Sequence, residues 1–218
     1  MSARTLLLGH RGLRIPGGPR ENTLAAFDLC LEQGCGGFEF DVRLTADGRT
    51  VICHDPGSGR KDISQTKSAE LPDLCSLDDV LERFSKVAFL DIELKVRGLE
   101  TIVQANLRRN PPERGFVVSS FLPEVINELG RQDSSLPLGL ICETLEQLSR
   151  WQDLPVGYVF TQHALADQSL IGKVQSAGKK VMAWTVNDEE KMRRLSGWNI
   201  DGIISDDPAL LVKTMREA

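Results

Sequence analysis

Short apolar segments alternate with amphipathic segments along the chain, as in proteins whose parallel strands are separated by helices. The amphipathic segments predict helices at 23–33, 77–84, 99–109, 122–131, 145–151, 168–177 and 189–195. In the first helix, Asn22 is the expected N-cap and Gly34 the expected stop signal. The apolar segments predict nine strands, at 5–9, 37–44, 50–54, 87–95, 116–120, 138–142, 158–162, 180–186 and 202–205.

One connection is too short to join parallel strands. Residues 45–49 alone separate strands 37–44 and 50–54, whereas a parallel crossover needs about a dozen residues. Asp47-Gly48 is a strong hairpin signal, so the second strand should return antiparallel beside the first. If the turn centres between Ala46 and Asp47, Glu39 lies opposite His54. The other eight strands predict an α/β fold, a TIM (β/α)₈ barrel with an extra hairpin strand after strand two, in one domain spanning 1–218.

Composition narrows the class further. A chain of 218 residues suits one barrel domain, and its net charge of −5 offers no basic surface for nucleic acid or an anionic membrane. No apolar run approaches the roughly 20 residues of a membrane span, so no stable membrane insertion is expected. Five cysteines, an odd number without a C-x-x-C pair, indicate reduced thiols. A cytoplasmic location is the default expectation, and the oligomeric state is left open.

Ionisable side chains gather at the ends of the first predicted strands, where TIM barrels carry their active sites. His10 follows strand 5–9, and the period-two alternation of strand 37–44 places Glu39 and Asp41 on one face. Strand 87–95 likewise presents Asp91, Glu93 and Lys95 on one face. The hairpin would add His54 to the same mouth.

Two interpretations fit this gathering of acids. In the first, Arg11 or Lys95 neutralises the carboxylates in a structural salt bridge at the barrel mouth. In the second, the acids bind a hard divalent cation through oxygen ligands, and the two nearby histidines take part in catalysis. Because two of the three histidines of the chain fall at this mouth, we favour the second interpretation.

At these residues the chain resembles the glycerophosphodiester phosphodiesterase family, phosphodiesterases with a TIM barrel like that of phospholipase C. The matching motifs occur in the family's order: His10-Arg11-Gly12, Glu21-Asn22-Thr23, Glu39-Phe40-Asp41-Val42, Thr45-x-Asp47-Gly48, His54-Asp55, Glu93-Leu94-Lys95, Trp184-Thr185-Val186-Asn187 and Asp201-Gly202-Ile203-Ile204-Ser205-Asp206. One departure is residues 56–64, a shorter segment than the family usually has, so part of a substrate-covering lid would be missing.

The resemblance implies metal-dependent hydrolysis of glycerophosphodiesters to glycerol 3-phosphate and an alcohol. By motif position it implies a divalent ion (Mg²⁺ or Ca²⁺, with Mn²⁺ as a third option) on Glu39, Asp41 and Glu93. It also implies His10 and His54 as the acid/base pair, and Arg11 and Lys95 as phosphate-binding cations. Trp184 is a candidate wall of the substrate site, with core packing as its alternative role, and His163 is a weaker candidate for substrate contact.

The sequence leaves several alternatives open. The attacking oxygen is either the glycerol 2-hydroxyl, which gives a cyclic phosphate, or water. His10 is the favoured base and His54 the favoured acid, and the reverse assignment is also compatible with the sequence. The rival functions are a phospholipase of the C or D type acting on lipids and a catalytically silent barrel that binds phosphate esters.

Overall fold

The computed structural model describes residues 5–59 and 61–217, and its central feature is a closed ring of eight parallel strands. The ring closes because the first strand pairs with both the second and the last. Its strands, in ring order, are β1 (Leu6–Gly9), β2 (Gly37–Leu44), β6 (Phe89–Leu94), β7 (Phe116–Ser120), β8 (Leu138–Cys142), β9 (Tyr158–Gln162), β10 (Lys180–Trp184) and β11 (Gly202–Ser205). The predicted TIM barrel is therefore confirmed.

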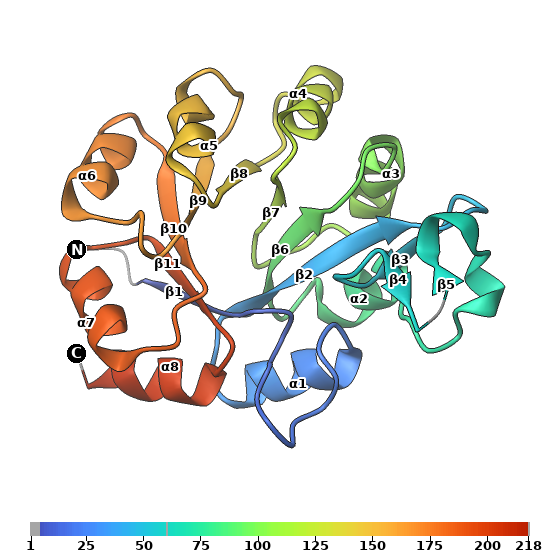
Figure 1. Cartoon of the computed structure of the whole chain (residues 1–218), viewed down its shortest axis with the longest axis horizontal. Helices are drawn as coiled ribbons and strands as arrows, with labels where there is room; N and C mark the ends of the chain where they lie inside the picture. Colours follow the sequence, from blue (N-terminus) through green and yellow to red (C-terminus); the bar gives the residue numbers. More distant parts are fainter. Residues whose placement is uncertain (1–4, 60, 218) are drawn as a thin grey trace.

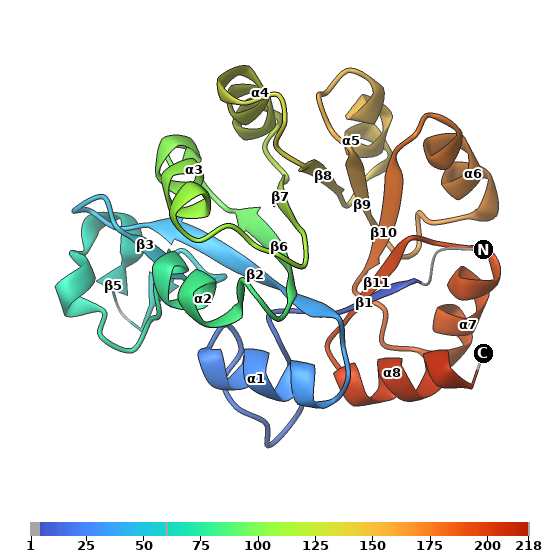
Figure 2. The same ribbon diagram turned by 180° about the vertical axis from the view of Figure 1, so that it is seen from behind.

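A helix follows every strand of the ring, so the helices surround the strands (Figures 1 and 2). Among the described residues no helix is both long enough and apolar enough to cross a membrane. The helices are α1 (Leu24–Glu32), α2 (Leu77–Phe84), α3 (Glu100–Arg109), α4 (Pro123–Gln132), α5 (Leu145–Ser149), α6 (Gln168–Ser176), α7 (Glu189–Gly197) and α8 (Pro208–Arg216), with 3₁₀ turns at Ile63–Gln65, Ser68–Glu70 and Arg150–Gln152.

Two helix features differ from expectation. Thr23, not Asn22, caps α1, because its hydroxyl accepts the Ala26 N–H. Asn22 instead adopts a left-handed φ of 57°, and its amide donates to Asp41 Oδ2. Gly34 follows the helix as expected. The helix α8 was not among the predicted helices, although Asp207 caps it and Pro208 occupies its first turn, both standard start signals.

The predicted hairpin forms, with a register one residue away from the expected one. Strand β3 (Thr50–Ile52) runs antiparallel to β2 outside the ring, and Leu44 pairs with Thr50. Residues Thr45 to Gly48 form a β-turn. Gly48, with a left-handed φ of 73°, extends the connection by one residue compared with the expected turn. The pairing therefore sets Val42 opposite Ile52, and the expected direct pairing of Glu39 with His54 is wrong.

The alternation of β2 divides the core into two layers. Phe38 and Phe40 face outward, where the Phe38 ring stacks on Phe27 with centroids 4.2 Å apart and meets Phe84 edge-on. Glu39 and Asp41 consequently face the inside of the ring. Below them the interior is filled by Leu8, Phe89, Val117, Ile141, Phe160, Met182 and Ile204. The barrel thus has a solid apolar floor beneath an acidic mouth.

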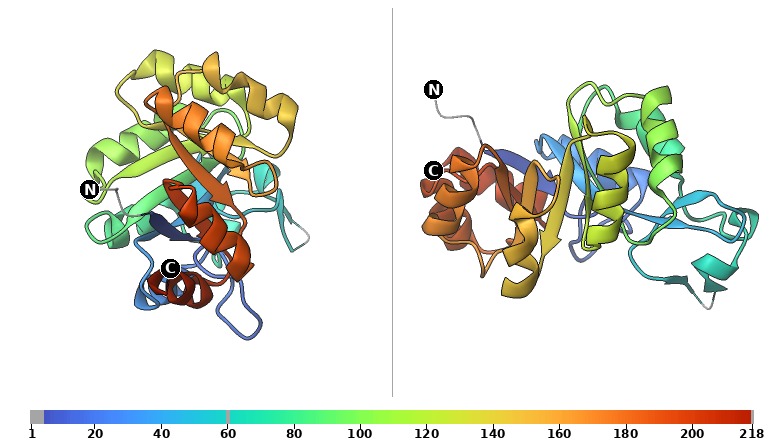
Figure 3. Two further views of the ribbon diagram at one scale, coloured as in Figure 1. Left: turned by 90° about the vertical axis from the view of Figure 1, so that its left-hand side faces the viewer. Right: turned by 90° about the horizontal axis from the view of Figure 1, so that it is seen from above.

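A small segment projects from one end of the molecule, as Figures 1 and 3 show. It contains β3 and a two-stranded ribbon, β4 (Gly57–Ser58) and β5 (Lys61–Asp62), which was not predicted. Ile63 and Leu71 pack on Val51 and Cys53 in an apolar cluster of their own, which ties this segment to the hairpin. The segment therefore stands beside the barrel mouth.

Candidate active site

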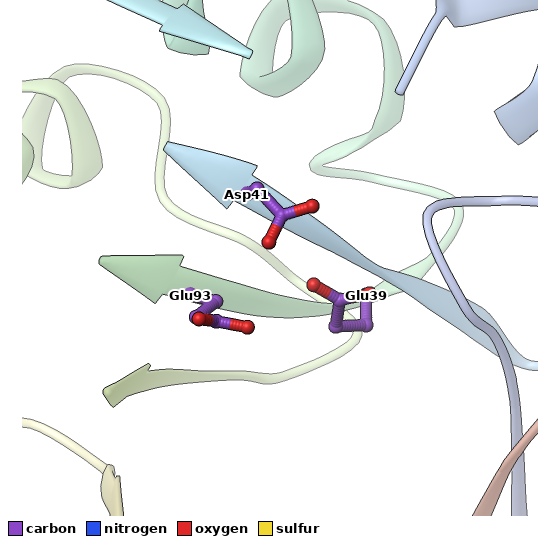
Figure 4. A group of neighbouring side chains, drawn as sticks. All are labelled: Glu39, Asp41 and Glu93. Carbon is purple, nitrogen blue, oxygen red and sulfur yellow. The ribbon is translucent and has the colours of Figure 1, made fainter. Parts of the chain in front are cut away.

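Three buried carboxylates lie together near the ends of two neighbouring barrel strands. Glu39 and Asp41 come from β2, Glu93 comes from β6, and Asp41 and Glu93 are register partners. One oxygen of each lies within 4.8 Å of the others. Their side chains converge on a common space (Figure 4). The structure thus brings together the three residues that the sequence nominated as metal ligands.

Two cations lie against this acidic group. Arg11 places Nε 3.2 Å from Asp41 Oδ2. Lys95 places Nζ 2.6 Å from Glu93 Oε1 and 3.2 Å from Asp41 Oδ1. Arg11 also pairs with Glu21 at 2.7 Å, which fixes the direction of its guanidinium. The salt bridges considered from the sequence are therefore present, and they occur alongside the acidic cluster.

The cations do not neutralise all three acids equally. Burial, reinforced by Asp41, raises the pKa of Glu39 well above its usual value, and the same causes raise the pKa of Glu93 to about 7. Burial opposes ionisation of Asp41 as well, but Lys95 and Arg11 outweigh it and keep its pKa low. Glu39 Oε1 is buried and accepts no hydrogen bond from the described residues. An orphaned carboxylate oxygen among hard oxygen donors fits a divalent cation.

His10 is held on both sides of its ring. Nδ1 lies 2.7 Å from Asp206 Oδ1, and Nε2 lies 3.9 Å from Glu39 Oε2. Asp206 is itself fixed by the Asn187 amide, which donates to its second oxygen at 2.7 Å. Burial lowers the pKa of His10 despite the opposing effect of Asp206. A largely neutral imidazole with an orienting carboxylate is suited to act as a general base.

The turn after His10 is built around the acidic cluster. Arg11 adopts a left-handed φ of 51°, which is unfavourable for a residue with a side chain. In this conformation its backbone N–H donates to Glu39 Oε2 at 2.9 Å. Backbone strain of this kind is typical of functional sites, where surrounding contacts hold it in place.

His54 reaches the mouth although the hairpin register differs from the expected one. The ladder ends at Ile52, and after a last bond from Cys53 N to Asp41 O the chain leaves the strand direction. The Arg43 guanidinium then donates to the His54 carbonyl, with Nε at 2.9 Å. His54 Nδ1 lies 2.8 Å from Asp55 Oδ1, and its half-exposed ring lines the same cleft as His10.

The cleft has a volume of about 340 Å³ and two chemically different halves. The half formed by β1, β2, β6 and the hairpin carries His10, Arg11, Glu39, His54, Glu93 and Lys95. The other half carries Phe121, Ile141, Phe160, Trp184 and Ile204, together with one charged residue, the exposed Glu143. Trp184 meets Phe121 edge-on, and its buried Nε1–H has no acceptor among the described residues. His163 lines a separate hollow beside α7 and not this cleft.

Some residues of the site were quoted in motifs without being assigned a role in the chemistry of the site. They are Glu21, which pairs with Arg11; Asn22, whose amide donates to Asp41 at 2.7 Å; and Asp206, which binds His10. Asp91 was placed on the correct face but was not assigned a function. It lies beside Glu39 in the register and lines the cleft, and its Oδ1 accepts the Ser119 hydroxyl. Burial raises its pKa well above the usual value.

Buried acids, two cations and two histidines at the carboxyl ends of barrel strands define a TIM-barrel hydrolase suited to anionic esters. The model of the glycerophosphoryl diester phosphodiesterase family matches residues 10–110 and 64–210. The chain belongs to this family, and it is a phosphoric diester hydrolase.

Relatives of known name and structure agree with this assignment. A glycerophosphodiester phosphodiesterase of Caldanaerobacter subterraneus is 27% identical over 98% of this chain and 99% of its own. The structure of the Thermotoga maritima enzyme superposes with a TM-score of 0.82 at 25% identity, covering 98% of this chain and 99% of its own. A phosphodiesterase of Oleispira antarctica, solved with the product sn-glycerol 3-phosphate, gives a TM-score of 0.87 at 25% identity and covers 98% and 97%.

Proposed function

We propose that the cleft hydrolyses small glycerophosphodiesters to glycerol 3-phosphate and an alcohol. The observation that carries the proposal is the buried group of Glu39, Asp41 and Glu93, with Arg11 and Lys95 against it and two histidines lining the same cleft. The sn-glycerol 3-phosphate bound to the Oleispira antarctica relative supports the same product here.

The three carboxylates would hold a hard divalent cation, with Mg²⁺, Ca²⁺ or Mn²⁺ as the candidates. All three residues offer oxygen ligands, and the unpartnered Glu39 Oε1 is available for coordination. When bound, such a cation neutralises charge on a phosphate oxygen and orients the phosphorus. It would also stabilise the ionised forms of Glu39 and Glu93, whose pKa values are raised by burial and by the neighbouring Asp41.

Arg11 and Lys95 bind the second non-bridging oxygen of the phosphodiester. The planar guanidinium of Arg11 suits a phosphate edge, and the ammonium of Lys95 acts as a point charge. Both are fixed by ion pairs with the acidic group, so they are positioned before the substrate arrives.

His10 removes the proton from the attacking oxygen, and His54 gives a proton to the departing alkoxide. One P–O bond forms to the attacking oxygen, one P–O bond to the alcohol breaks, and one water is consumed overall. The assignment of His10 as base follows from its buried, carboxylate-oriented ring, and that of His54 as acid from its place at the rim, where the alcohol leaves. If water attacks, the product forms in this one step. If the glycerol 2-hydroxyl attacks, this step gives a cyclic phosphate, and the one water is consumed in a second step that opens it.

Trp184 and the apolar half of the cleft form a wall for the carbon skeleton of the glycerol moiety. The ring of Trp184 stands at the end of β10, next to Thr185, whose hydroxyl is 3.5 Å from His10 Nδ1. This places the apolar wall on the side of the proposed base.

The whole reaction takes place in one domain spanning 1–218, and a cytoplasmic location stays a prediction.

The test is release of glycerol 3-phosphate from a panel of glycerophosphodiesters with added Mg²⁺, Ca²⁺ or Mn²⁺, with EDTA as the control. We expect divalent-dependent release. Binding of diesters without any release would instead identify a silent phosphate-ester-binding barrel. Release from phospholipid vesicles in preference to the water-soluble diesters would identify a phospholipase.

A further inference from the structure

A small hollow lies between the loop that follows β9 and the helix α7. Its volume is about 170 Å³, which is smaller than the roughly 300–1,000 Å³ of a pocket for a drug-sized ligand. His163 and Ala166 line it from the loop, and a row of residues from Lys191 to Trp198 lines it from α7. None of these residues lines the catalytic cleft, so the hollow is a separate space.

The helix α7 presents two unpaired cations to this hollow. Lys191 is followed at three, four and seven residues by Arg194, Leu195 and Trp198, a spacing that places all four on one face of the helix. The side chains of Lys191 and Arg194 make no hydrogen bond or ion pair with the described residues. The adjacent Arg193, which does not line the hollow, has two glutamate partners. The cations that remain unpaired are therefore the two that line the hollow.

His163 adds a third donor to the hollow. Its backbone N–H donates to the Trp184 carbonyl at 2.8 Å, while its partly buried ring makes no hydrogen bond with the described part of the chain. Burial lowers the pKa of His163, Lys191 lowers it further, and Asp188 opposes both effects. A negative charge bound between the ring and Lys191 would stabilise both side chains in their protonated forms.

The nearby carboxylates do not supply that charge. Asp188 and Asp167 are the N-caps of α7 and α6, so each has a side-chain oxygen bonded to a backbone N–H. Glu190, one turn before Arg194, is exposed and does not line the hollow. Carboxylates do line the catalytic cleft and the hollow beside α4. In a chain with a net charge of −5, a hollow with unpaired cations and no acid in its described lining favours an anionic ligand.

We propose that this hollow binds the phosphate group of a small phosphate monoester, at a site separate from the catalytic cleft. The planar guanidinium of Arg194 suits two phosphate oxygens, Lys191 acts as a point charge, and the ring of His163 donates a further hydrogen bond. A monoester carries about −1.5 to −2 charges near neutral pH, which suits two fixed cations beside a histidine better than a singly charged diester does. Leu195 and Trp198 offer an apolar surface to a short carbon skeleton.

Proton NMR of the histidine rings can follow this hollow and the catalytic cleft in one spectrum. Of the three histidines, His163 lines the hollow, and His10 and His54 line the cleft. The wild type is titrated in EDTA near neutral pH with inorganic phosphate and with glycerol 3-phosphate, and His163→Gln assigns the signal. We expect a saturable shift of the His163 signal with both probes, and about twofold to fivefold tighter binding of glycerol 3-phosphate because its carbons reach the apolar surface. Equal affinities would contradict the monoester and leave free phosphate as the ligand, and an unmoved His163 signal would overturn the site.

Lys191→Ala and Arg194→Ala test the two cations. Each should weaken the binding of both probes about twofold to fivefold, as expected for one exposed ion pair, when binding is followed on the His163 signal. Arg193→Ala is the matched control, because Arg193 lies on the same helix and does not line the hollow. Equal losses in all three variants would show a general effect of net charge instead of a site. Unchanged binding in both Lys191→Ala and Arg194→Ala would overturn the assignment.

Sulfate tests the charge of the ligand without the titration of phosphate, because it keeps two negative charges across the titration range of histidine. The charged groups around the ring of His163 are Lys191, Arg194 and Asp188. Bound sulfate should raise the pKa of His163 by about 0.2–0.7, the equivalent of one exposed ion pair, so its affinity should increase as pH falls through this pKa. Chloride at equal ionic strength is the control for screening. A shift of the same size with chloride, or no shift with sulfate, would overturn the proposal.

Discussion

Glu39 and Glu93 are the two proposed metal ligands whose ionised forms are least stabilised at the barrel mouth. Both are buried beside another acid, and Glu39 Oε1 has no hydrogen-bond donor among the described residues. Glu39→Gln and Glu93→Gln should therefore abolish divalent-dependent turnover, because each removes an anionic oxygen ligand. The measurement is glycerol 3-phosphate release across a metal titration, with circular dichroism to verify folding. Full activity of both folded variants in EDTA would disprove the metal site.

Each of the two histidines should contribute to kcat. His10→Ala and His54→Ala should each lower kcat by about 10²–10⁴-fold, the usual range for loss of a general acid or base. Single-turnover measurements at saturating metal and substrate would show the loss directly. His163→Ala is the control, because that residue lines a different hollow. Near-normal kcat in both active-site variants would require another source for the proton transfers.

Asp206 should matter through His10, since its carboxylate fixes the ring at 2.7 Å. Asp206→Asn should lower kcat at least about tenfold, because losing the orienting carboxylate of a catalytic histidine can cost up to about 10⁴-fold. KM should change little, as Asp206 does not line the cleft. Recovery of kcat with Asp206→Glu would support positioning. An increase in KM with unchanged kcat would instead indicate a role in substrate binding.

The position of Asp206 could have been inferred from the sequence. The first and last strands of a closed barrel are neighbours, and Gly9 pairs with Ser205. His10 comes directly after Gly9 and Asp206 directly after Ser205, so the two residues lie side by side. The prediction used the strand ends one at a time, so it found His10 and did not connect it to a residue 196 positions away.

At the scale of elements, β2 depends on a glycine that allows close strand contact. A Cβ built on Gly37 would lie 1.9 Å from the Phe89 carbonyl oxygen, a backbone atom that cannot rotate away. Gly37→Ala should lower the free energy of unfolding by about 3 kcal/mol or more, at the upper end of overpacking effects. Urea denaturation measures this change.

Gly172→Ala supplies the matched control for Gly37→Ala. Gly172 is exposed within α6, and an added Cβ meets no atom within 4 Å. This substitution should raise the free energy of unfolding by about 0.5–1 kcal/mol, because alanine is the better helix former. Equal effects at the two positions would show that the contact between Gly37 and Phe89 does not limit the packing of β2.

The elements also show where prediction from the sequence ends. Period-two alternation correctly placed Glu39 and Asp41 inside the ring, since that pattern follows from backbone geometry alone. The predicted hairpin register was wrong by one residue, because Gly48 extends the turn by one residue. That extension depends on the backbone dihedral angles of the turn and not on the pattern of apolar and polar residues. His54 still reaches the cleft because the ladder ends before it and Arg43 holds its carbonyl. Side-chain contacts of that kind follow no local pattern.

At the scale of the whole molecule, the acidic mouth should make stability depend on both pH and metal. Burial raises the pKa of Glu93 from 4.5 to about 7 and that of Glu39 well above its usual value. Between pH 4.5 and 7 the folded protein therefore binds more protons than the unfolded chain. The sign of this difference means that the contribution of these groups to stability falls as pH rises through the window.

In EDTA, the free energy of unfolding should accordingly lose about 2 kcal/mol or more from these groups between pH 5 and pH 7, since each pKa unit corresponds to about 1.4 kcal/mol. A divalent ion that binds the folded state should offset this loss at pH 7, by about 2.7 kcal/mol at 100 times its dissociation constant. Urea denaturation at both pH values, with and without metal, measures the two effects. Glu93→Gln isolates them, because the variant lacks the carboxyl whose pKa is raised and should show a smaller pH dependence in EDTA. The variant should also gain less stability from metal. If the wild type and Glu93→Gln responded alike to pH and to metal, the acidic mouth would not be the origin of either effect.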